Sequence, residues 1–124
     1  VLSSSDLQNE IDELDLSHNK INSTGADLLS SALSRNKNKV KNINISYNFI
    51  GTKGIKAVAD ALKLNSSLVI INLRNNYINA EGAKAISELM KQNKTIKLLD
   101  LNFLFREFST NYPFRTVRCS IRFS

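Results

Sequence analysis

Few residues in this chain of 124 could carry out catalysis, and those few are scattered along it. His18 is the only histidine and Cys119 the only cysteine, and they lie near opposite ends of the chain. A cysteine nucleophile needs a base within hydrogen-bonding reach, and Cys119 falls in an irregular segment, so we predict no such catalytic pair. A single cysteine also excludes an internal disulfide, which suits a reducing compartment.

Two other groups could bind ligands. The segment Gly51–Gly54 contains residue types found in phosphate-binding loops, but the spacing G-x-x-x-x-G-K-[ST] is absent. Glu13 and Asp15 share one face of a predicted strand and could attract a hard cation, which takes about six to eight oxygen ligands. Because too few oxygens are present, we expect no metal, no cofactor and no enzymatic activity.

These residues belong to a pattern that repeats along the chain. The spacing L-x-x-L-x-L-x-x-N-x-I begins at Ile11, at Val40 and at Leu68. A fourth copy begins at Ile96 and then fails, because Leu104 stands where the asparagine is expected. Alternating apolar residues over such a short run predict a strand in each copy.

An apolar stripe with helical spacing follows each predicted strand. In the first copy its members are Gly25-Ala26, Leu29 and Ala32-Leu33, and the same offsets recur in the next two copies. Residues that favour turns and caps precede the helices at Asn22, Gly51 and Asn79 and follow them at Asn36, Asn65 and Asn93. Each unit therefore reads as strand, turn, helix and turn, and neighbouring units must stack to bury their apolar faces.

This combined consensus resembles the long, ribonuclease-inhibitor-like leucine-rich repeat, seen also in NOD-like receptors and in the GTPase-activating protein for Ran. The resemblance covers about residues 11–102. It implies an α/β fold, a right-handed solenoid or horseshoe with short parallel strands on the concave face and helices on the convex face. We expect residues 1–102 to hold the end of a preceding unit, three complete repeats and the start of a fourth. No conventional cap is evident, so we expect a fragment or a truncated isoform of a longer solenoid.

The resemblance also implies a non-catalytic protein-binding module of the scaffold, receptor or GTPase-regulator type. Residues between the consensus leucines alternate toward the concave surface. The candidate partner-binding residues are Glu13, Asp15, Ser17, His18, Asn42, Asn44, Ser46, Tyr47, Asn72, Arg74, Asn75 and Asp100. Asn19, Asn48 and Asn76 take a structural role, because asparagines at this position of the family hydrogen-bond the backbone between units.

The net charge of +6 leaves an alternative open. Basic residues in the helix-to-strand loops could form a lysine ridge, which consists of Arg35, Lys37, Lys39, Lys41, Lys63, Lys91, Lys94 and Lys97. Together with a basic tail, this ridge could bind nucleic acid or an anionic surface. No aromatic residues accompany these loops, so we favour a protein partner of unknown identity. No apolar run approaches the roughly 18 residues that span a bilayer, and we expect a cytoplasmic protein.

The repeat is lost in the tail, residues 103–124, where aromatic and basic residues crowd together. Val117, Cys119, Ile121 and Phe123 alternate with polar residues, which predicts a strand. This irregular tail could cap the open end of the last unit, or it could be a non-native and poorly ordered C-terminus. We favour the second interpretation because the fourth unit breaks within its strand consensus.

Overall fold

A computed structural model describes residues 12–35, 39–105 and 115–122, with side chains as far as Leu101. Within this part, strands and helices alternate until the last two strands. In chain order the elements are β1 (Glu13–Asp15), α2 (Ser23–Leu33), β2 (Asn42–Asn44), α3 (Gly51–Lys63), β3 (Ile70–Asn72), α4 (Ala80–Gln92), β4 (Leu98–Phe105) and β5 (Arg115–Arg122). Residues 1–11, predicted to end a preceding unit, lie outside the described part, as do Asn36 and Lys37.

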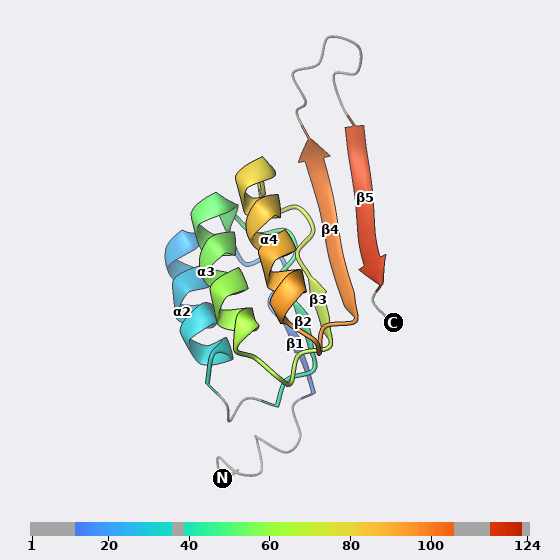
Figure 1. Cartoon of the computed structure of the whole chain (residues 1–124). Coiled ribbons are helices and arrows are strands. Elements are labelled where there is room, and N and C mark those ends of the chain that lie inside the picture. The colour runs from blue at the N-terminus through green and yellow to red at the C-terminus, as the bar shows by residue number, and fades with distance from the viewer. Residues whose placement is uncertain (1–11, 36–38, 106–114, 123–124) are drawn as a thin grey trace.

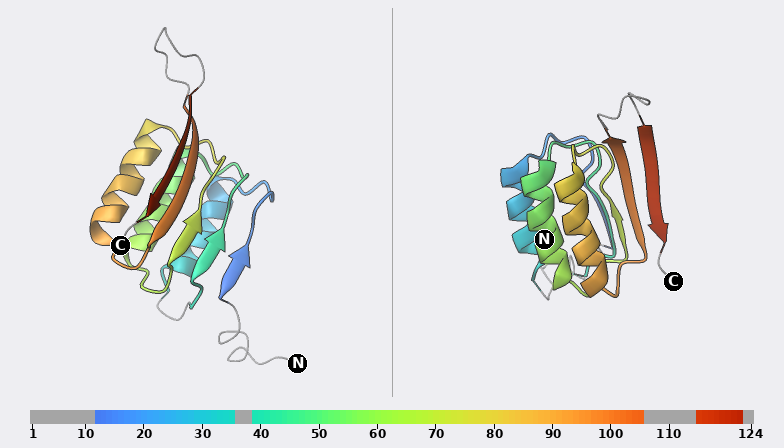
Figure 2. Two further views of the ribbon diagram at one scale, coloured as in Figure 1. Left: turned by 90° about the vertical axis from the view of Figure 1, so that its right-hand side faces the viewer. Right: turned by 45° about the horizontal axis from the view of Figure 1, so that its top comes forward.

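The first four strands form a parallel sheet in the order of the chain. The register aligns Leu14, Ile43, Ile71 and Leu99, which hold the same position in the repeat consensus. The side-by-side stacking that the repeat predicts is therefore confirmed. The three helices form one layer against one face of this sheet (Figure 1), and the opposite face carries no helix in the described ranges, as the left view of Figure 2 shows.

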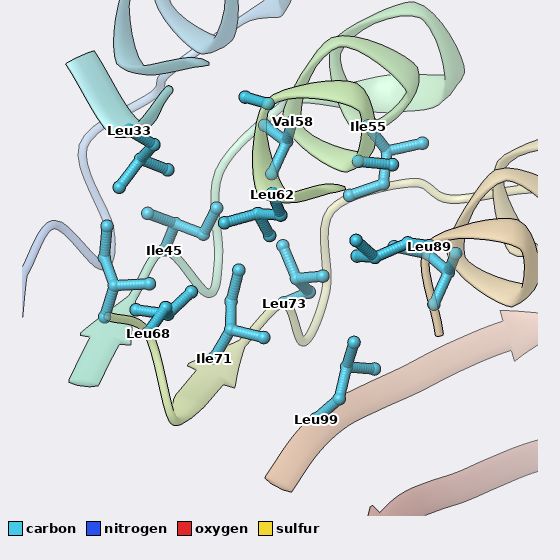
Figure 3. Close-up of a cluster of buried hydrophobic side chains, with 14 of the residues drawn as sticks. Leu33, Ile45, Ile55, Val58, Leu62, Leu68, Ile71, Leu73, Leu89 and Leu99 are labelled. Carbon is cyan, nitrogen blue, oxygen red and sulfur yellow. The ribbon is translucent and has the colours of Figure 1, made fainter. Parts of the chain in front are cut away.

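Apolar side chains fill the space between the sheet and the helices. Ile71 and Leu73 of the third repeat meet Leu62 and Leu89 from α3 and α4 (Figure 3), and each of these side chains is at most 1% exposed. Full burial of such a side chain stabilises the fold by about 1.5–3 kcal/mol. Leu14 in the first strand is only partly buried. Burial is therefore complete where a unit has neighbours on both sides.

Local signals set where the helices begin and how closely they pack. Asn22 and Asn79 cap α2 and α4, because their side-chain oxygens accept hydrogen bonds from the backbone of Gly25 (3.1 Å) and Gly82 (3.0 Å). α3 begins instead at Gly51, whose φ of +66° favours glycine. A Cβ added at Gly82 would lie 2.8 Å from the side chain of Ile55, so this glycine lets α4 approach α3.

Asparagine side chains tie the turns of neighbouring units together after the strands. Asn48 donates from Nδ2 to the carbonyl oxygen of Leu16 at 3.0 Å, and its Oδ1 accepts from the backbone of Asn19 and Ile21, both at 2.9 Å. Asn76 donates in the same way to Ile45 at 2.7 Å. Asn48 and Asn76 are buried. Asn19, in the first unit, is exposed and its side chain donates to Ser17 of its own turn.

A second set of asparagines ties the units together at the opposite edge of the sheet. Asn65 and Asn93 are 8% and 5% exposed, and their Nδ2 atoms donate to the carbonyl oxygens of Leu33 (2.9 Å) and Leu62 (2.7 Å) in the preceding units. The side-chain oxygen of Asn65 also accepts from the backbone of Leu68 at 2.8 Å. The sequence predicted turns here, and the structure adds a contact between units.

The tail contributes an antiparallel strand to the sheet. β5 pairs with β4 over eight residues, from Leu98 opposite Arg122 to Phe105 opposite Arg115. The strand predicted from the alternation in the tail is thus confirmed for residues 115–122. It pairs with the backbone of β4 on the side away from β3, which is the arrangement that the capping interpretation requires.

Candidate functional site

The helix-free face of the sheet brings many of the predicted partner-binding residues together. Asp15, Asn44, Asn72 and Asp100 are consecutive partners in the parallel register, so they form one row across four strands. A second row comprises Glu13, Asn42, Ile70 and Leu98. We call these two rows the concave face, after the surface that the resemblance to the repeat family implies. All eight side chains are exposed or half-buried.

Three side chains of this face also close the turns at the ends of their strands. Asp15 accepts hydrogen bonds from the backbone nitrogen (2.9 Å) and hydroxyl (2.6 Å) of Ser17. Asn44 accepts the equivalent pair from Ser46, and Asn72 accepts from the backbone nitrogen of Arg74 at 3.1 Å. Such bonds to a residue two positions on are typical of Asp and Asn in turns. The sequence analysis missed this structural role.

Ser46 is placed differently from its predicted position. Strand alternation predicts an exposed side chain, but Ser46 is buried, with 3% of its surface accessible. The alternation stops because β2 ends at Asn44, and the serine hydroxyl then donates to Asn44 at 2.6 Å. Ser17, at the same position of the first unit, is half-buried.

Charge divides the concave face into two parts. Glu13 and Asp15 are exposed on β1, and hydrogen bonds from Ser17 lower the pKa of Asp15 below its usual 3.8, so its carboxylate is ionised at neutral pH. On the other side, Arg74 lies 3.9 Å from Asp100, and its Nε atom is buried without a partner in the described part of the chain. A guanidinium has five N–H donors and the side chain of Arg74 is 27% exposed, so donors other than the buried Nε remain for a further acceptor.

The turns after the strands hold the remaining predicted residues. His18, Tyr47 and Asn75 occupy equivalent positions, and all have φ between 53° and 58°, a left-handed conformation that is uncommon for residues other than glycine. The rings of His18 and Tyr47 stack with a centroid distance of 4.5 Å and an interplanar angle of 9°. The backbone of Tyr47 donates to Arg74 at 2.8 Å, which places Asn75 in the next turn of the same row.

Two exposed aromatic residues in these turns were missed by the sequence analysis. Phe49 and Tyr77 are 52% and 72% exposed, and their rings stack at 5.5 Å with an interplanar angle of 13°. They share one repeat position with Lys20, which the consensus leaves unspecified. Their residue types were the available signal, since aromatic side chains at variable positions of a repeat have no place in its core.

The lysine ridge is partly neutralised. Lys63 pairs with Asp60 at 3.1 Å and Lys91 with Glu88 at 3.3 Å, each within one helical turn. Lys97 is exposed, with no ion pair in the described ranges. Among residues 12–35, 39–105 and 115–122, no group of three His, Cys, Asp or Glu residues could hold a metal ion, and no helix is long and apolar enough to cross a membrane.

A family model of the leucine-rich repeat matches residues 11–30, 36–59 and 64–87, more than half of the chain. The chain is a leucine-rich repeat protein. Each matched stretch covers the strand and most of the helix of one of the three units described above. A search of curated proteins found no match. Leucine-rich repeat domains generally mediate protein–protein interaction and are typically non-catalytic.

Proposed function

We propose that this leucine-rich repeat protein is a non-catalytic binding module that holds a protein partner against its concave face. The observation that carries the proposal is the parallel register, which aligns Asp15, Asn44, Asn72 and Asp100 on a face without helices. Polar side chains from four strands thus meet on one surface. The proposal includes a role as scaffold, receptor or GTPase regulator. It also includes membership of the ribonuclease-inhibitor-like type of repeat.

The charges on the concave face suit a partner that carries both a basic and an acidic side chain. Glu13 and Asp15 would attract a lysine or arginine of the partner. Arg74 would take a carboxylate, because a guanidinium offers parallel donors to both oxygens. Asn42 and Asn44 of β2 lie between the two charged parts and supply amide groups that fix the register of the partner.

Two finer features belong to the same proposal. The strand-helix-strand connections are right-handed, as nearly all parallel connections are, so the units form a right-handed solenoid. The protein works in the cytoplasm, since a single cysteine suits a reducing compartment.

Affinity capture with matched variants tests the concave face. Ile70→Glu places a carboxylate on this face, and Ser87→Glu places the same group on the exposed side of α4. Immobilised wild type and both variants are incubated with cytosolic extract, and the bound proteins are quantified by mass spectrometry. We expect a set of proteins that wild type and Ser87→Glu retain and Ile70→Glu loses. Equal capture by all three would contradict the proposal.

The lysine ridge supplies the competing function, which a salt titration tests separately. Binding through several phosphates weakens steeply as salt rises. We expect negligible nucleic-acid binding even at low salt, because Lys63 and Lys91 are already paired with carboxylates. Tight binding at low salt that falls steeply with added salt would favour the ridge instead.

A further inference from the structure

The concave face is small for a stable interface. Four strands of three paired residues cover about 15 Å by about 10 Å, whereas a standard interface buries about 800 Å² on each partner. A partner held there must also touch neighbouring surfaces. The strand-to-helix turns border the concave face directly, at the upper edge of the sheet in Figure 1, toward which the parallel strands point.

Among the side chains that the structure describes, four aromatic rings lie on these turns, and we call them the ring edge: His18, Tyr47, Phe49 and Tyr77. Tyr47, Phe49 and Tyr77 are 45%, 52% and 72% exposed. Grouped exposed aromatic residues mark interaction sites on soluble proteins, and tyrosine is among the residues that dominate binding energy. Three of the four also keep a left-handed backbone, the exception being Phe49. Such strain is tolerated at functional surfaces.

The stacking indicates which kind of ligand suits these rings. Each ring already covers one face of its neighbour, at 4.5 Å in one stack and 5.5 Å in the other. Nucleobases bind by stacking on exposed ring faces. In each stacked pair, one of the two faces of each ring is covered by the other ring and cannot bind a base. Stacked rings still present their edges, which carry partial positive charge and attract oxygen atoms. The tyrosine hydroxyls add hydrogen-bond donors.

The charges beside the ring edge also favour a ligand that carries negatively charged oxygen atoms. Lys20 and Lys53 are exposed and form no ion pair with any described residue. Between the strand ends and the first helical turns, residues 16–25, 45–54 and 73–82, the one acidic residue is Glu81. It is paired with Lys56 at 2.9 Å. Unpaired positive charge therefore lies in the row of Phe49 and Tyr77, at Lys20, and in the first turn of α3, at Lys53. The carboxylate of Asp15 lies on the concave face.

We propose that the ring edge binds an extended acidic segment of a protein partner. Apolar side chains of that segment pack on Phe49 and Tyr77. Its carboxylates approach Lys20, Lys53 and the hydrogen atoms at the rims of the aromatic rings. This surface extends the interface beyond the concave face, so the inference rests on the proposed binding role but uses different residues.

Titration of defined peptides tests the inference. The probe is a peptide of repeated Glu-Glu-Leu-Gly units; the comparison probes are the same peptide with lysine for glutamate and an oligothymidylate of equal length. Backbone amide NMR shifts of the full chain report both the affinity and the residues affected. We expect saturable binding of the acidic probe, with shifts concentrated at residues 47, 49 and 77. The lysine probe and the oligothymidylate should bind at least about tenfold more weakly.

Variants assign the binding to the ring edge. Phe49→Ser combined with Tyr77→Ser should weaken binding of the acidic probe about tenfold or more. Lys20→Glu, which keeps all four rings, should also weaken it. Leu64→Ser is the matched control, because Leu64 is 70% exposed at the other end of α3, and binding should be unchanged.

Several outcomes would overturn the inference. One is no saturable binding of the acidic probe at about 1 mM, which corresponds to less than about 4 kcal/mol of binding free energy. Another is tighter binding of the lysine probe or of the oligothymidylate. A third is binding that survives the Phe49 and Tyr77 changes but is lost in Ile70→Glu. That last result would leave the proposed function of the concave face in place and remove only the ring edge.

Discussion

The two edges of the repeat sheet are built from the same units but differ in what they expose. At the helix-to-strand edge, Asn65 and Asn93 are buried and bond to the preceding units. At the strand-to-helix edge, the rings of Phe49 and Tyr77 are more than half exposed. The comparison shows that positions fixed by the repeat hold the units together, whereas the positions that vary between units carry the surface available to a partner.

The largest effect is expected at the buried asparagine edge. Asn65→Ala removes the amide that bonds to Leu33, Ser67 and Leu68, and it leaves the carbonyl of Leu33 and the N–H of Leu68 buried without partners. Each such group costs about 1–3 kcal/mol, so we expect a loss of about 3 kcal/mol in the free energy of unfolding, measured by urea denaturation.

Asn19→Ala is the matched control for that prediction. Asn19 is exposed, and its amide donates to Ser17 at 3.1 Å within its own turn. We expect a loss below about 0.5 kcal/mol, as is usual for surface substitutions. Equal losses in the two variants would mean that contacts between units contribute little to stability.

A smaller effect is expected where the helices begin. Asn79→Ala removes the oxygen that accepts from Gly82 at 3.0 Å, and loss of such a cap costs about 1 kcal/mol. Thermal unfolding measures the change. Asn79→Ser, which keeps a capping oxygen, should recover most of it; failure to recover would show that the side chain contributes through packing instead.

Relief of backbone strain at Lys20, beside the ring edge, should instead increase stability. Lys20 is exposed with φ of 56°, a conformation that glycine adopts without steric penalty. We expect Lys20→Gly to stabilise the fold by about 0.5–1 kcal/mol in urea denaturation, since the relief exceeds the added freedom of the unfolded chain. Lys97→Gly, at an exposed lysine outside the left-handed region, should not stabilise it. Destabilisation by Lys20→Gly would mean that the turn carries no strain.

The smallest effect concerns the ion pair between α3 and α4. The ammonium of Lys56, 2.9 Å from Glu81, lowers the pKa of Glu81 below its usual 4.5. Because this pKa is lower in the folded state, the stabilisation is complete above pH 4.5 and is lost as pH falls through the folded value. Both groups are exposed, so Glu81→Gln should only slightly reduce the loss of unfolding free energy that occurs at acidic pH. The measurement is urea denaturation at a series of pH values. A stability profile identical to that of wild type would exclude even this contribution.

The repeat spacing was sufficient to predict most of the fold. Consensus positions such as Ile43 and Ile71 have one role, burial between sheet and helices, so their spacing specifies parallel strands in register. The contacts of Asn65 and Asn93 between units could not be predicted, because a turn asparagine looks the same whether it bonds locally or to a neighbour. The strand in the tail was predictable from its alternation, but its pairing with β4 was not.

The candidate site was less predictable than the fold. Strand alternation identified the concave rows, yet it cannot show that β2 ends at Asn44 and that Ser46 is then buried. The ring edge depends on left-handed turns, which alternation does not describe. Phe49 and Tyr77 stack because equivalent turns lie side by side in successive units, a relation that only the register reveals.

The most direct test of the account combines stability and binding in one variant, Phe49→Ser with Tyr77→Ser. If the ring edge serves a partner while the asparagines hold the units together, unfolding free energy should fall by only about 1 kcal/mol, the usual contribution of an aromatic pair. Affinity for the acidic peptide should fall about tenfold or more. A loss of about 3 kcal/mol in stability with unchanged peptide affinity would contradict the account, because the rings would then be part of the structural framework.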